Sequence, residues 1–151
     1  MLRLKTLIQI VHEIRTADPE SAVGESFLAA LIEKNELWHT YRGNRLVVDA
    51  EAVAPALNRL LGFEEMAELP RIRTIRGAAA ELKRSRPEIG IGEKMIRSAV
   101  KDGRIASIGI GNRAYIAMRS FDEPYCRRIF EQASVVSKKA IIRRGVMKQM
   151  A

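Results

Sequence analysis

One stretch of the chain, KMIRSAVK at residues 94–101, gathers side chains that could bind a polyanion. Its polar residues are spaced i, i+3, i+4 and i+7, which places them on one continuous helix face. The major groove of DNA admits a helix, from which Arg and Lys can reach phosphates and guanine edges. Together with polar residues that follow the helix, the candidate DNA contacts are Lys94, Arg97, Ser98, Lys101, Arg104, Asn112 and Arg113.

Catalytic chemistry has much less support. The chain has one cysteine, Cys126, and two distant histidines, His12 and His39, so no zinc-ligand pattern is present. No Ser/His/Asp or paired-carboxylate grouping stands out. The glycines of GIGIGNR follow a helix and enter a strand, which is the wrong context for a nucleotide-binding loop. We therefore expect a protein with no catalytic residues, no metal and no cofactor.

The sequence also indicates the cellular location to be expected for this protein. The longest apolar run is only a few residues, so we expect no membrane span. The start MLRLKTLIQIVHEIR lacks a small-residue cleavage site and is interrupted by His12 and Glu13, so it does not resemble a signal peptide. A single thiol excludes an internal disulfide, which favours a cytoplasmic location.

Charge is distributed unevenly along the chain. Residues 1–68 hold 7 Lys or Arg and 11 Asp or Glu, a net charge of −4. Residues 69–151 hold 19 and 7, a net charge of +12. The basic part is therefore the part expected to meet a polyanion.

An internal repeat organises the chain. The tripeptide GNR occurs at residues 43–45 and again at 111–113, an offset of 68 positions. At that offset Pro19 and Glu20 align with Pro87 and Glu88 without any gap, and apolar residues align in kind. This predicts two copies of one module.

Each copy is expected to contain a helix, a turn, a second helix, a β-hairpin and a further helix. In the first copy these are helices at 6–17 and 24–35, a hairpin at 37–48 and a helix near 49–62. In the second they are helices at 74–85 and 92–103, strands at 104–109 and 113–118, and a helix from Ser120 or Asp122. The predicted fold class is α+β, mainly α, with two tandem winged helix-turn-helix domains. The expected boundaries are 1–62, a linker at 63–73, 74–133, and a basic tail at 134–151.

This pattern resembles the small excisionase-like, MerR-type winged-helix domains of phages and mobile elements. The match is carried by Ile96-Arg97, Val100-Lys101, Gly103, Ile105 and Gly111-Asn112-Arg113, and more weakly by the first copy. Ala106 departs from it, because the family often has proline there. The resemblance implies double-stranded DNA binding, with the second helix in the major groove and the wing on the backbone or minor groove. It also implies an excisionase-like architectural factor or a transcriptional regulator.

The first copy has lost the basic face at the equivalent positions. Lys94 corresponds to Ser26, Arg97 to Ala29, Ser98 to Ala30 and Lys101 to Glu33, which suits protein contact better than DNA. The candidate protein interface, for a homodimer or another protein, is Ser26, Ala29, Ala30, Glu33 and Trp38.

In the tail, possible phosphate contacts are Lys138, Lys139, Arg143 and Arg144. Three alternatives stay open for the whole chain. The basic helix face could be a solvated surface without a ligand. Both winged helices could serve as a protein–protein interaction scaffold. RNA is the third alternative, although few exposed aromatic residues argue against single-strand recognition.

Overall fold

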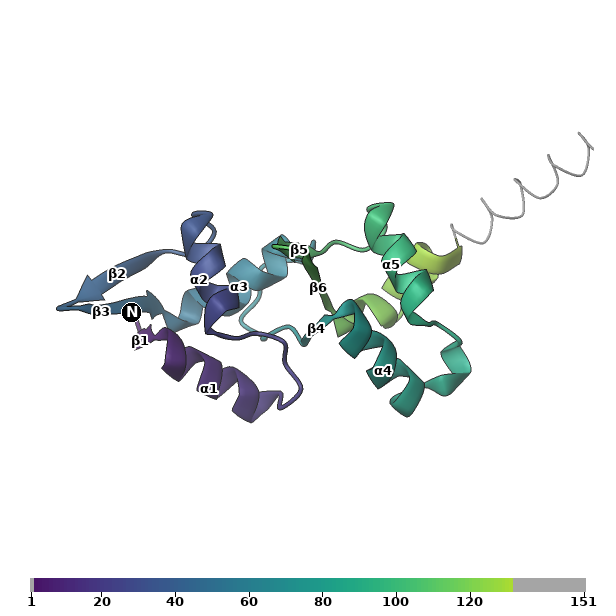
Figure 1. Cartoon of the computed structure of the whole chain (residues 1–151), viewed down its shortest axis with the longest axis horizontal. Helices are drawn as coiled ribbons and strands as arrows, with labels where there is room; N and C mark the ends of the chain where they lie inside the picture. Colours follow the sequence, from purple (N-terminus) through teal and green to yellow (C-terminus); the bar gives the residue numbers. More distant parts are fainter. Residues whose placement is uncertain (1, 132–151) are drawn as a thin grey trace, which may run out of the picture. The chain divides into compact units, whose positions relative to one another are not determined.

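The computed structural model describes residues 2–131, and these residues adopt an α+β fold with two small antiparallel sheets (Figure 1). They form two compact units, of which the first ends at Met118 and the second begins at Arg119. Within the described residues, no helix is long and apolar enough to cross a membrane. The basic tail residues Lys138, Lys139, Arg143 and Arg144 lie outside the described part of the chain.

We call residues 2–68 the first half and residues 69–118 the second half of the first unit. The first half consists of β1 (Leu4–Thr6), α1 (Leu7–Ala17), α2 (Glu25–Glu33), β2 (His39–Arg42), β3 (Arg45–Asp49) and α3 (Ala50–Leu60). The second half consists of β4 (Ile72–Thr74), α4 (Ile75–Ser85), the short 3₁₀ helix η1 (Pro87–Ile89), α5 (Glu93–Lys101), β5 (Ile108–Ile110) and β6 (Arg113–Ala117).

The two sheets have the same strand order and register. They run β1-β3-β2 and β4-β6-β5, with every neighbouring pair antiparallel. Lys5 lies opposite Val48, and 68 positions later Arg73 lies opposite Ile116. The hairpins agree as well, since Arg42 pairs with Arg45 and Ile110 with Arg113. The 68-residue spacing read from the sequence therefore relates positions with equivalent strand pairing.

The helix ends and turns also agree at this spacing. The Thr6 and Thr74 hydroxyls accept hydrogen bonds from backbone N–H groups three residues on, which caps the N-termini of α1 and α4. Gly43 and Gly111 both have a φ of 59°, a left-handed conformation that glycine adopts readily at the first central position of a hairpin turn.

Three features differ from the sequence-based expectation. β1 and β4 were not predicted, and β4 includes Ile72 and Arg73, which the sequence assigned to a linker. The strand expected at 104–109 begins only at Ile108 and ends at Ile110. The helix expected from Ser120 or Asp122 is preceded by the 3₁₀ helix η2 (Met118–Phe121), and regular helix is found at 125–131.

The described part of the second unit has its own aromatic contacts. The rings of Phe121 and Phe130 stack with their centroids 6.2 Å apart, and the guanidinium groups of Arg119 and Arg128 lie over the Tyr125 ring. Cys126 is half-buried.

The two halves of the first unit share one hydrophobic core. Buried side chains of the first half, including Phe27, pack with four residues of the second sheet, which are Ile72, Ile108, Tyr115 and Ala117. Phe27 meets Tyr115 edge to face with ring centroids 4.8 Å apart. Hairpin β5–β6 is therefore partly buried against the first half and does not project freely.

A buried ion-pair cluster joins the same two halves. Arg73, only 3% exposed, donates two hydrogen bonds to the Asp18 carboxylate at 2.7 and 2.8 Å and one to Glu81 at 3.0 Å. Burial by itself lowers the pKa of Arg73, but the hydrogen bonds and charges of Asp18 and Glu81 outweigh it, so the pKa is raised. At the border of this cluster Arg84 binds both oxygens of Glu20. The ion pairs that Arg73 and Arg84 form with the first half fix the orientation of the two halves relative to each other.

Candidate nucleic-acid interface

Helix α5 presents one buried and one polar face. Ile96 and Ala99 are fully buried, because they lie on the face that turns toward the rest of the second half. The four polar residues selected from the sequence, Lys94, Arg97, Ser98 and Lys101, are all exposed. The helix begins after Gly92, which offers no side-chain cap, and ends where Gly103 takes a left-handed φ of 75°. The polar face therefore lies on a short helix anchored by its opposite side.

The basic residues of this face differ in their partners. Arg97 binds Glu93 one turn back at 2.7 Å, in an exposed i,i+4 pair of a kind that adds little stability. Lys94 and Lys101 form no ion pair with any other described residue. Arg104 is mostly buried and is held by Asp102 at 3.0 Å, so it is less accessible than the other predicted contacts.

The hairpin residues lie close to the turn that joins β5 and β6. Asn112 and Arg113 are both exposed, next to Gly111. The backbone carbonyl of Gly109 accepts a 2.6 Å hydrogen bond from the Lys34 ammonium of the first half. The hairpin is thus held by the first half while its turn stays accessible.

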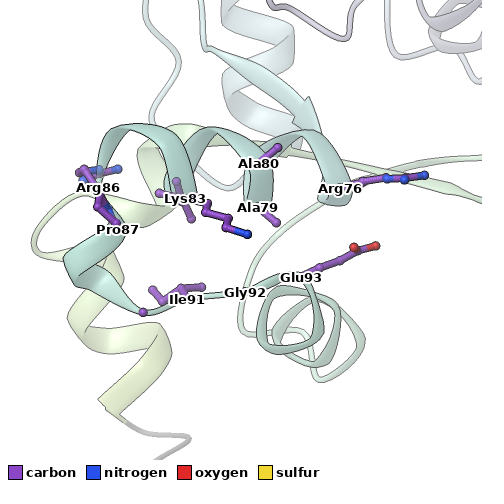
Figure 2. Close-up of a pocket in the computed structure, with 11 residues that line it drawn as sticks. Arg76, Ala79, Ala80, Lys83, Arg86, Pro87, Ile91, Gly92 and Glu93 are labelled. Carbon is purple, nitrogen blue, oxygen red and sulfur yellow. The ribbon is translucent and has the colours of Figure 1, made fainter.

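A basic cleft beside α5 was missed by the sequence analysis. It has a volume of about 700 Å³ and lies between α4 and the segment that leads into α5. Its lining combines apolar side chains with three cations, Arg76, Lys83 and Arg86, and with one carboxylate, Glu93. Figure 2 shows the Lys83 side chain directed into the space between α4 and the Ile91–Gly92 segment. The sequence did contain a signal for this cleft, because Arg76 and Lys83 are seven residues apart, which places them on the same helix face two turns apart.

The candidate protein interface of the first half is only partly exposed. Ser26 and Glu33 are exposed on α2, whereas Ala29 and Ala30 are half-buried. Trp38 is 55% exposed just before β2. The α2 residues lie 68 positions before the residues of the basic face of α5, and they add no positive charge.

The described residues contain no group of three or more His, Cys, Asp or Glu side chains arranged to hold a metal ion. No protein-family model matches this chain, and comparisons with curated proteins and with solved structures also found no match.

Proposed function

We propose that this protein binds double-stranded DNA through α5 of the second half. The observation that carries the proposal is the exposed row of Lys94, Arg97, Ser98 and Lys101 on a helix whose other face is fully buried. A side chain on such a helix can enter the major groove while the buried face keeps the helix in place.

A winged helix-turn-helix is the fold proposed for each half. The order of helix, turn, helix and hairpin in the second half supports it, with a preceding strand completing the sheet. The shared strand register, caps and hairpin turns at a spacing of 68 residues support a tandem duplication. On this proposal α5 is the reading helix, and Asn112 and Arg113 of the wing contact the backbone.

The charge distribution supports assigning DNA binding to the second half and not to the first. The second half, residues 69–118, has 11 Lys or Arg against 4 Asp or Glu, whereas residues 1–68 have 7 against 11. The cations of the cleft, Arg76 and Lys83, extend the positive surface beyond α5. A phosphate backbone would be attracted to the second half and repelled by the first.

The family resemblance favours a cytoplasmic factor of a phage, transposon or plasmid, acting in DNA recombination as an excisionase-like protein or as a transcription regulator. The interaction-scaffold alternative is favoured by one observation, namely that β5–β6 is partly buried against the first half, which leaves only its turn for the backbone.

A salt-titrated mobility-shift assay on random duplex DNA tests the proposal. We expect binding by the full chain that weakens steeply with salt, because cationic contacts release counterions. A Lys94→Glu, Lys101→Glu variant should lose binding. Arg3→Glu, compared with Lys94→Glu alone, is the charge-matched control, since Arg3 is exposed in the first half, whereas Lys5 is unsuitable because it pairs with Glu13. Binding that survives the α5 substitutions would refute the assignment.

A further inference from the structure

The first half carries an exposed apolar surface where the second half is basic or small. At the 68-residue spacing, Arg76 is replaced by Ile8, Ala114 by Leu46 and Gly109 by Tyr41. Ile8 is 65% exposed and Tyr41 is 64% exposed. Leu46 is half-buried against the core, so Ile8 and Tyr41 supply most of the exposed apolar area. Large apolar side chains that are exposed in one patch mark contact surfaces.

These residues border a groove. Leu7, Ile8 and Leu46 line a groove of about 560 Å³ between the start of α1 and hairpin β2–β3. Tyr41 lies opposite Leu46 across the hairpin, so it extends the same surface. We call Leu7, Ile8, Tyr41 and Leu46 the apolar face.

The groove has charges of both signs at its edge. Glu25, in the first turn of α2, and Arg45, the first residue of β3, both line it. Neither has an ion-pair partner among the described residues. Arg42 pairs with Arg45 across the hairpin and strengthens the positive edge, while Glu33 lies further along the acidic helix. The groove is thus lined by an acidic residue from α2 and by a basic residue from the hairpin.

We propose that the apolar face is a two-fold interface with a second copy of this chain. In a two-fold dimer whose axis runs along the groove, Glu25 of each copy faces Arg45 of the other, and the apolar residues meet between them. A partner with a uniformly acidic or basic surface would match only one edge, so the mixed charges favour self-association. The choice of the first half as the protein-binding half rests on the proposed function.

Dimerisation has a consequence for DNA binding. Each dimer would carry two basic second halves, and linked binding sites raise the effective concentration of the second contact. The apolar face would then supply avidity without contacting DNA.

Sedimentation of the full chain over a range of concentrations tests the interface. We expect a reversible monomer–dimer equilibrium in the wild type. Ile8→Glu should raise the dimer dissociation constant by roughly tenfold or more, because it places a charge in the apolar centre. Met95→Glu is the matched control, since Met95 is 45% exposed but lies on α5 of the second half. A monomeric wild type at every concentration, or equal effects of the two substitutions, would overturn the proposal.

A charge exchange makes the test specific for the two-fold pairing. Glu25→Arg and Arg45→Glu, made in separate chains, should each weaken the homodimer. An equimolar mixture of the two chains should recover association as a heterodimer, because the side chain at position 25 of either chain then faces an opposite charge at position 45 of the other. No recovery in folded chains would exclude this pairing. A dimer without DNA binding would refute only the proposed function, and monomers that bind DNA would refute only the interface.

Discussion

At the level of single residues, the basic face of α5 contains side chains suited to different contacts. Arg97 has a planar guanidinium that can bind a guanine edge through two hydrogen bonds, and its present partner Glu93 is exposed and easily exchanged. Lys101 is a point charge near the C-terminus of the helix and has no ion-pair partner within the described residues. On the proposed function, base reading is therefore assigned to Arg97 and phosphate contact to Lys101.

Substituting these two residues should separate their roles. Arg97→Ala is expected to weaken specific binding by about 1–3 kcal/mol and to relax sequence preference. Lys101→Ala is expected to weaken all duplexes alike and to reduce the log–log salt slope by roughly one. Binding titrations at several salt concentrations measure both quantities. Unchanged affinity in both variants, with circular dichroism showing an intact fold, would identify the face as a solvated surface.

Because the Glu81 carboxylate is buried and paired with arginine, we expect the folding stability to decrease at acidic pH. Burial raises the pKa of Glu81, but its interaction with Glu20 and the charges and hydrogen bonds of Arg73 and Arg71 outweigh burial, so the pKa lies below its ordinary value of 4.5. A lowered pKa in the folded state contributes stability above the unfolded pKa, and this contribution disappears as the pH falls through the folded pKa.

Urea unfolding of Glu81→Gln at a series of pH values measures this contribution. The variant should be less stable than the wild type near neutral pH, because Arg73 loses part of its buried charge pairing. The difference should begin to shrink near pH 4.5, where the unfolded carboxylate becomes protonated, and should disappear as the pH falls through the lower pKa of the folded state. Glu88→Gln, at an exposed position in η1, is the control. A difference that stays constant down to the acid limit would contradict the role of the Glu81 charge.

At the level of elements, helices and hairpin turns were predictable and the third strand of each sheet was not. The 3.6-residue periodicity of α4 and α5 and the GNR turns are local signals, so they could be read directly from the chain. β1 and β4 have three residues each, too few for an alternating pattern, and they exist because they pair with β3 and β6 far along the chain. The same limit applies to the cleft at Lys83 and to the burial of β5–β6 against the first half, since both depend on tertiary packing.

The threonine caps give an element-level prediction. Thr74→Ala should reduce the free energy of unfolding by about 1 kcal/mol, because the N–H of Gly77 loses the acceptor that caps α4. Thr6→Ala should have a similar effect on α1, where the cap is reinforced by the Gln9 side chain, which accepts a hydrogen bond from the Thr6 N–H. Chemical denaturation measures both. Thr16→Ala, in the last turn of α1 with a hydroxyl that donates to the His12 carbonyl, is the control expected to change stability less.

At the level of the whole molecule, the shared core joins an acidic half and a basic half into one folding unit. Ile72, Ile108, Tyr115 and Ala117 would be exposed if the second half were separated, and the Arg73 guanidinium would lose Asp18. Separating a buried charge from its partner costs about 3–5 kcal/mol, a large part of the stability of a small domain. Loss of DNA binding on truncation would therefore report loss of folding as well as loss of contacts.

A substitution in one half should consequently destabilise the other. Leu82 is 1% exposed on α4 and lies outside the shared core, so Leu82→Ala removes packing only within the second half, at a cost of about 2–5 kcal/mol. The only tryptophan, Trp38, lies in the first half and reports on that half by fluorescence. If residues 2–118 unfold together, Leu82→Ala should lower the denaturation midpoint seen by Trp38 as much as the midpoint seen by far-UV circular dichroism.

Lys83→Ala, at an exposed neighbouring position, should move neither midpoint by a comparable amount. A Trp38 transition that keeps its wild-type midpoint in Leu82→Ala would show that the halves unfold independently, despite the ion pair and the aromatic contact that join them.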